Sequence, residues 1–181
     1  MRKLLFAAVI GGSLLVALVG GSLALAKNDK GGDARAKLSG YDEAPSVSTR
    51  ARGSFRAEID RDGDSIDYKL RYEGIEGGTA NVAHIHLGQR HTAGGVSAFL
   101  CGGGDKPACP TPGGTVEGTI DAADVIGPTG QGILAGQLDE LVRAIRARAT
   151  YVNVHSTMFP AGEIRGQVKS DRRKHRDGDD D

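Results

Sequence analysis

Three histidines have the residue type and the spacing to bind one metal ion. His84 and His86 stand two residues apart in the string HIH, and His155 ends the string YVNVH. Side chains alternate faces along a strand, so His84 and His86 share a face, with Cα atoms about 6.5–7 Å apart. Such imidazoles can lean onto one ion at about 2.0–2.1 Å per nitrogen, and His155 from another strand would complete a site suited to copper or zinc.

Polar neighbours are expected to form one patch with these histidines. In YVNVH the two valines are expected to face the core, which places Asn153 on the same side as His155. In the closing string GEIRGQ the same alternation places Glu163 and Arg165 outward. If the three strands are neighbours, Asn153, Glu163 and Arg165 surround the histidines. Arg165 could pair with Glu163 or with an incoming carboxylate.

Two other roles for the same residues require no metal. Buried polar clusters often fix strand register through hydrogen bonds, and the patch could equally bind a protein partner. Hydrolysis is disfavoured, because no G-x-S-x-G string places a serine on a sharp turn. We expect His91, in a turn, and His175, in a charged segment, to be exposed, and we assign no catalytic residue.

Short runs of alternating apolar and polar residues predict the antiparallel strands that would position this patch. Phe55, Ala57 and Ile59 alternate with Arg56 and Glu58, and a second alternating run follows a turn at 62–64. Strands are predicted at 34–39, 55–59, 66–72, 81–87, 96–100, 114–120, 150–155 and 163–168. The last two should form a hairpin.

One segment has helical rather than strand periodicity. Leu138, Leu141, Val142 and Ile145 recur at helical spacing, which predicts a short amphipathic helix against the sheet. Eight strands and one helix indicate an all-β fold, an antiparallel Greek-key sandwich or barrel of immunoglobulin-like or superoxide-dismutase-like type.

The two ends of the chain differ from its middle. Residues 1–26 carry Arg2 and Lys3 ahead of an uncharged run that closes on Ala24-Leu25-Ala26, the pattern of a cleaved export signal; an uncleaved membrane anchor is the alternative. Residues 27–33 are expected to be a linker, and residues 169–181, rich in charge, a disordered tail. We therefore expect the protein to be secreted or on the cell surface. We expect it to contact a membrane only through the N-terminal segment, if that segment is not cleaved.

Charge and cysteine content limit the remaining function classes. Cleavage after residue 26 would remove two of 23 basic side chains and none of 23 acidic ones, so the chain stays close to neutral and nucleic-acid binding is not expected. Cys101 and Cys109 flank a glycine-rich loop, and in an exported chain we expect them to form a disulfide.

The strings HIH, YVNVH and GEIRGQ, in this order, resemble the CHRD (chordin-type) domain family over residues 34–168. This resemblance implies an extracellular module that binds a protein partner rather than an enzyme. The H-x-H strand also looks like the copper strand of Cu,Zn superoxide dismutase, which favours copper over zinc. The chain lacks that family's other metal ligands, so dismutase activity is not implied. The competing functions are thus a non-catalytic binding or structural module and a copper- or zinc-binding protein with redox activity.

Overall fold

A computed structural model of the chain describes residues 32–170. The strands are β1 (Gly32–Ser39), β2 (Arg52–Ile59), β3 (Ile66–Glu73), β4 (Ala80–Leu87), β5 (Gly95–Cys101), β6 (Gly114–Ile120), β7 (Thr150–Ser156), β8 (Ile164–Gln167) and β9 (Lys169–Ser170). The helix α1 spans Leu138–Arg146, and single turns of 3-10 helix occur at η1 (Gly40–Asp42), η2 (Ala122–Asp124) and η3 (Thr129–Gln131).

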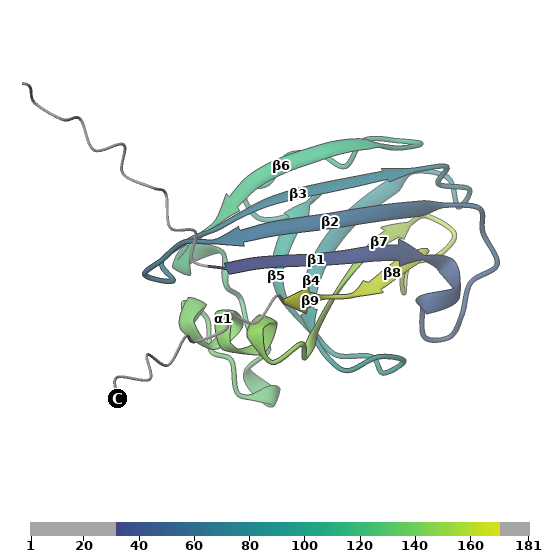
Figure 1. Cartoon of the computed structure of the whole chain (residues 1–181). Coiled ribbons are helices and arrows are strands. Elements are labelled where there is room, and N and C mark those ends of the chain that lie inside the picture. The colour runs from purple at the N-terminus through teal and green to yellow at the C-terminus, as the bar shows by residue number, and fades with distance from the viewer. Residues whose placement is uncertain (1–31, 171–181) are drawn as a thin grey trace, which may run out of the picture.

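All strands join one antiparallel sheet that curls into a nearly closed barrel or sandwich (Figure 1). Its order is β5-β4-β7-β8-β1-β2-β3-β6, and β9 also pairs with β1. The two end strands, β5 and β6, lie close to each other. The predicted helix is confirmed: α1 buries its leucines, its valine and its isoleucine in the core. The all-β prediction with one helix is therefore correct.

The predicted hairpin of β2 and β3 is also confirmed. Ile59 pairs with Ile66 at its turn, and Gly63 adopts a φ of 85°, which glycine tolerates without strain. The side chain of Asp60 closes the turn, because its Oδ1 accepts hydrogen bonds from the backbone N–H groups of Gly63 and Asp64. Phe55 and Leu70 are paired across this hairpin and both point into the core.

Strands β4, β7 and β8 are neighbours, as the patch hypothesis requires. His84 pairs with Asn153, and Asn153 pairs with Arg165 on its other side. Two residues further along β4, His86 pairs with Tyr151. Directly opposite residues in an antiparallel pair project from the same face, so all five side chains share one side of the sheet. The predicted β7–β8 hairpin positions this row.

The boundaries of the expected linker and tail differ from the observed ones. Gly32 and Asp33, expected in the linker, pair with β2 and begin β1. Lys169 and Ser170, expected in the tail, form β9 against β1. Short polar strands of this kind lack the apolar alternation that would predict them. The expected signal segment and the rest of the linker and tail lie outside the described residues, and nothing in residues 32–170 forms a helix long and apolar enough to cross a membrane.

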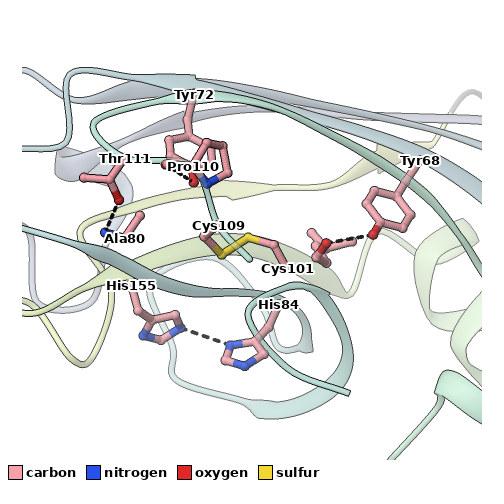
Figure 2. Close-up of a disulfide and its surroundings, with 10 residues drawn as sticks. Tyr68, Tyr72, Ala80, His84, Cys101, Cys109, Pro110, Thr111 and His155 are labelled. Carbon is pink, nitrogen blue, oxygen red and sulfur yellow. Dashed lines mark hydrogen bonds between the residues drawn. A yellow bond between two sulfur atoms is a disulfide. The ribbon is translucent and has the colours of Figure 1, made fainter. Parts of the chain in front are cut away.

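The predicted disulfide joins Cys101, at the end of β5, to Cys109, with 5.1 Å between the Cα atoms (Figure 2). The loop it closes is fixed at a second point, where the Tyr72 hydroxyl donates to the Pro110 carbonyl at 2.6 Å. The neighbouring Thr111 hydroxyl accepts from the backbone N–H of Ala80 at the start of β4 at 2.9 Å. The crosslink therefore anchors the strand pair that carries two of the histidines.

Candidate metal centre

The structure brings His84, His86 and His155 together. One ring nitrogen from each lies within 4.8 Å of the others. His84 Nδ1 and His155 Nε2 are 3.2 Å apart and face each other from adjacent strands (Figure 2). Ile85, between the two histidines of β4, is fully buried in the core on the opposite face of the sheet. Strand alternation predicted that the three histidines share a face, and the pairing of β4 with β7 brings them together.

The histidines face away from the core, yet they are not open to solvent. The exposed fractions of His84, His86 and His155 are 8%, 6% and 9%. The Phe99 ring of β5 lies 4.8 Å from the His84 ring, centroid to centroid, and Tyr151 stacks on His86 at 4.6 Å with the planes 5° apart. These ring contacts and low exposed fractions make the three histidines a buried cluster rather than an exposed surface patch.

Backbone carbonyls select the tautomer of two of the rings. His86 Nδ1 lies 2.9 Å from the Gly94 carbonyl oxygen, and His155 Nδ1 lies 2.9 Å from the Pro160 carbonyl oxygen. A carbonyl can only accept a hydrogen bond, so each Nδ1 carries the proton and donates. In a neutral ring the lone pair is then on Nε2. Metal-binding histidines in proteins are commonly oriented by this same contact.

The two lone pairs point into the cluster. His86 Nε2 is buried and has no hydrogen-bond partner. His155 Nε2 faces His84 Nδ1 and also lies 3.0 Å from the Asn153 Oδ1 atom, which is an acceptor as well. Acceptor atoms that face one another at a buried point lack a donor, and a bound cation could fill that role. The charge of Arg165 nearby acts against a cation.

Burial keeps all three imidazoles neutral. Desolvation, reinforced by the neighbouring histidines, lowers the pKa of His84 to about 3. Desolvation lowers the pKa of His86 to about 4, although the Gly94 contact opposes it, and it lowers the pKa of His155. Only a neutral imidazole can bind a metal ion, so the cluster is in its ligating form at neutral pH.

A family model for the CHRD domain matches residues 34–168, which is most of the chain and the segment predicted from the three strings. The chain belongs to the CHRD domain family. A comparison with curated proteins finds no match. The recognised strings lie in β4, in β7, and in β8 with the two residues before it. The three histidines of this CHRD domain lie on the first two of these strands.

Arg165 lies at the edge of the cluster and has partners other than Glu163. Its Cζ atom sits 3.4 Å from the centroid of the Tyr151 ring, and its Nη2 donates to the Gln89 carbonyl at 2.7 Å. A guanidinium over an aromatic face is held by the ring's negative π surface. His86, Tyr151 and Arg165 therefore form a stack that fixes the ring of one candidate ligand.

Glu163 has a different role from the one expected. It precedes β8, and its carboxylate accepts from the hydroxyl of Thr49, in the segment before β2, at 2.9 Å. In the β3–β4 connection it accepts from the backbone N–H groups of Glu76 at 2.8 Å and Gly77 at 3.0 Å. Its side chain is fully buried. Alternation cannot predict a side chain that lies outside the strand, and Glu163 is a structural anchor of that connection in the CHRD domain.

Glu43, which sequence reasoning missed, lies beside the cluster. It follows η1 in an irregular loop, and its exposed fraction is 5%. Burial raises its pKa to about 7, although the Ala44 backbone N–H, the Arg165 charge and the Asn153 amide favour the ionised form. Its Oε1 and the Asn153 Nδ2 atom both flank Gly162, where a Cβ would lie 2.2 Å and 2.8 Å from them. No periodicity marks such a loop position.

His91 lies apart from the cluster, as expected. It is exposed in the β4–β5 loop and adopts a φ of 62°, a conformation that a histidine tolerates better than most residues. His175 lies outside the described residues. His91 therefore provides a matched control for experiments on the other histidines.

Proposed function

We propose that this CHRD-domain protein binds one transition-metal ion, copper or zinc, through His84, His86 and His155. The observation that carries the proposal is the convergence of one ring nitrogen from each of three buried, neutral imidazoles within 4.8 Å. Imidazole ligands suit copper and zinc, and a set of three histidines leaves room for a further ligand.

A purely structural hydrogen-bond network accounts for the cluster less well. His84 Nδ1 can donate a hydrogen bond to His155 Nε2. The Gly94 carbonyl accepts a hydrogen bond from His86, and the Pro160 carbonyl accepts one from His155. In this assignment His86 Nε2 is buried and makes no well-formed hydrogen bond, although the Asn153 side chain lies close enough to raise the pKa of this ring. An unpaired polar atom there would cost about 1–3 kcal/mol. An ion would satisfy that lone pair together with the other two.

The rest of the proposal concerns where the protein acts and to which functional class it belongs. Membership of the CHRD family supports a non-catalytic binding or structural module outside the cell or on its surface, with a protein partner that the family does not specify. Export is proposed from residues 1–26, and an intact mass that starts after Ala26 would test it. The H-x-H strand on a curled antiparallel sheet supports a Greek-key relationship with superoxide-dismutase barrels and a preference for copper, with redox activity as the alternative to a purely binding role.

Equilibrium dialysis of the purified chain against Zn²⁺ and, separately, Cu²⁺ tests the proposal, with bound metal measured by elemental analysis. We expect one equivalent to bind, and we expect His86→Gln to weaken binding by at least about tenfold, the loss of one good ligand contact. The control His91→Asn should bind like the wild type. Folded wild-type protein that retains no stoichiometric metal would refute the proposal and leave the partner-binding module.

A further inference from the structure

The three candidate ligands bring no negative charge to a bound ion. Within residues 32–170, the group of ligand atoms that all lie within 4.8 Å of one another comprises the three histidines and no carboxylate. Burial lowers the pKa of each imidazole, so each ring is neutral. In many protein sites anionic carboxylates or thiolates offset the charge of a divalent ion. This set of donors lacks that compensation.

Arg165 adds a positive charge beside the cluster. Its exposed fraction is 2%, so solvent does little to screen it. Its guanidinium carbon lies 3.4 Å from the centroid of the Tyr151 ring, and that ring stacks on the His86 ring at 4.6 Å. The Gln89 carbonyl that accepts from the guanidinium is neutral. The charge acts on the cluster, since it contributes to lowering the pKa of His86.

Two acidic residues act on Arg165 at longer range. Asp42 also forms an ion pair with Arg90 at 3.9 Å, so much of its charge is already balanced. Burial raises the pKa of Glu43 to about 7, so this carboxyl is mostly neutral in mildly acidic solution. Below pH 7 the surroundings of the three imidazoles therefore have a net positive charge.

We propose that the cluster selects cuprous copper, Cu⁺, over Cu²⁺ and that Arg165 contributes to this preference, an inference that rests on the metal site proposed above. Copper is one of the metals that imidazole ligands suit. The cost of burying an ion rises with the square of its charge, and its repulsion by Arg165 rises in proportion to its charge. Both effects penalise Cu²⁺ more than Cu⁺.

The size of the Arg165 effect follows from its distance to the cluster. The two stacking distances together place the guanidinium about 8 Å from the His86 ring, and at an effective dielectric constant of about 20 a unit charge at that range weakens binding roughly 30-fold for each positive charge on the ion. Cu²⁺ has one charge more than Cu⁺ and is disfavoured by that factor. Asp42 opposes part of the effect, so we expect about tenfold from Arg165.

A redox titration of the full chain with one equivalent of copper at pH 6 tests the proposal. The midpoint potential of bound copper, followed by the loss of the Cu²⁺ paramagnetic resonance signal, is compared with that of free copper in the same buffer. One electron passes from the mediator to Cu²⁺, and each tenfold in the ratio of the two affinities is about 59 mV. We expect the bound potential to lie at least about 59 mV above the free one.

Variants of Arg165 separate its charge from its packing. Arg165→Gln should lower the potential of bound copper by about 59 mV, the tenfold effect of the lost charge. Arg165→Lys keeps the charge and should stay within about twofold of wild type, or about 18 mV. Arg143→Gln removes an exposed charge on α1 and should have an equally small effect.

Three results would overturn the proposal. A wild-type potential at or below that of free copper would show that the cluster prefers Cu²⁺, and this measurement needs no variant. A raised potential that is unchanged in Arg165→Gln, or that falls equally in Arg165→Lys, would show that the charge of Arg165 is not a cause. A folded chain that retains copper in neither oxidation state would refute the metal site as well. Copper that binds at a low potential refutes the selection of Cu⁺ alone, so the two proposals are distinguishable.

Discussion

Replacement of Glu43 by glutamine should make the protein relatively more stable as the pH rises. The folded chain holds the pKa of this carboxyl at about 7, above the ordinary value of 4.5, because burial disfavours the charged form. The folded state therefore binds the proton more tightly than the unfolded state. The contribution of the Glu43 carboxyl to the stability of the folded state is greatest below about pH 4.5 and declines as the pH rises toward 7.

The size of this effect follows from the two pKa values. Ionising the buried carboxyl between pH 5 and pH 8 should reduce the free energy of unfolding by about 2.5 kcal/mol. Glutamine keeps the shape and does not titrate, so the difference between Glu43→Gln and wild type should grow by that amount over the same range. The titration of the histidines occurs in both proteins and cancels from the difference.

Urea unfolding of metal-free protein at pH 5 and pH 8 measures this difference. The exposed Glu117 is the matched control, and Glu117→Gln should change stability by a similar small amount at both pH values. A difference between Glu43→Gln and wild type that stays constant from pH 5 to pH 8 would refute the reasoning, because it would mean that Glu43 titrates normally in the folded chain.

Three further predictions concern the site and its supports. Since burial lowers the pKa values of His84 and His86 to about 3 and 4 and also lowers that of His155, Zn²⁺ affinity should change by less than about tenfold between pH 7.5 and pH 5.5, and a larger drop in titrations would contradict the burial of these rings. Serine in place of Cys101 and Cys109 should lower the free energy of unfolding by about 2–3 kcal/mol in chemical denaturation; an unchanged midpoint would show that the crosslink adds nothing. Glu163→Ala leaves two backbone donors without their acceptor and should cost about 2–4 kcal/mol, while metal affinity measured by dialysis stays within about twofold. A large loss of affinity in that variant would place Glu163 in the site after all.

Much of the fold was predictable because its strands alternate cleanly. The run from Phe55 to Ile59 and the string YVNVH both have one apolar face, and each became a strand with that face in the core. The same alternation placed the three histidines on one side, and the predicted β7–β8 hairpin brought Arg165 beside Asn153. A period of two residues determines which side chains share a face once the strands are paired.

Other features depend on loops and on pairing partners, which alternation does not specify. Gly94 and Pro160 supply carbonyls that orient two imidazoles. Every residue has a backbone carbonyl, so the residue types do not indicate these contacts. Glu43 and Glu163 occupy irregular segments, where parity has no meaning.

The central claim is that three imidazoles hold one ion, and electron paramagnetic resonance of the chain with one equivalent of Cu²⁺ tests it most directly. The account predicts hyperfine coupling from three imidazole nitrogens, reduced to two in His86→Gln and unchanged in His91→Asn. A spectrum that is identical in wild type and His86→Gln, or that shows a single imidazole, would contradict a shared site.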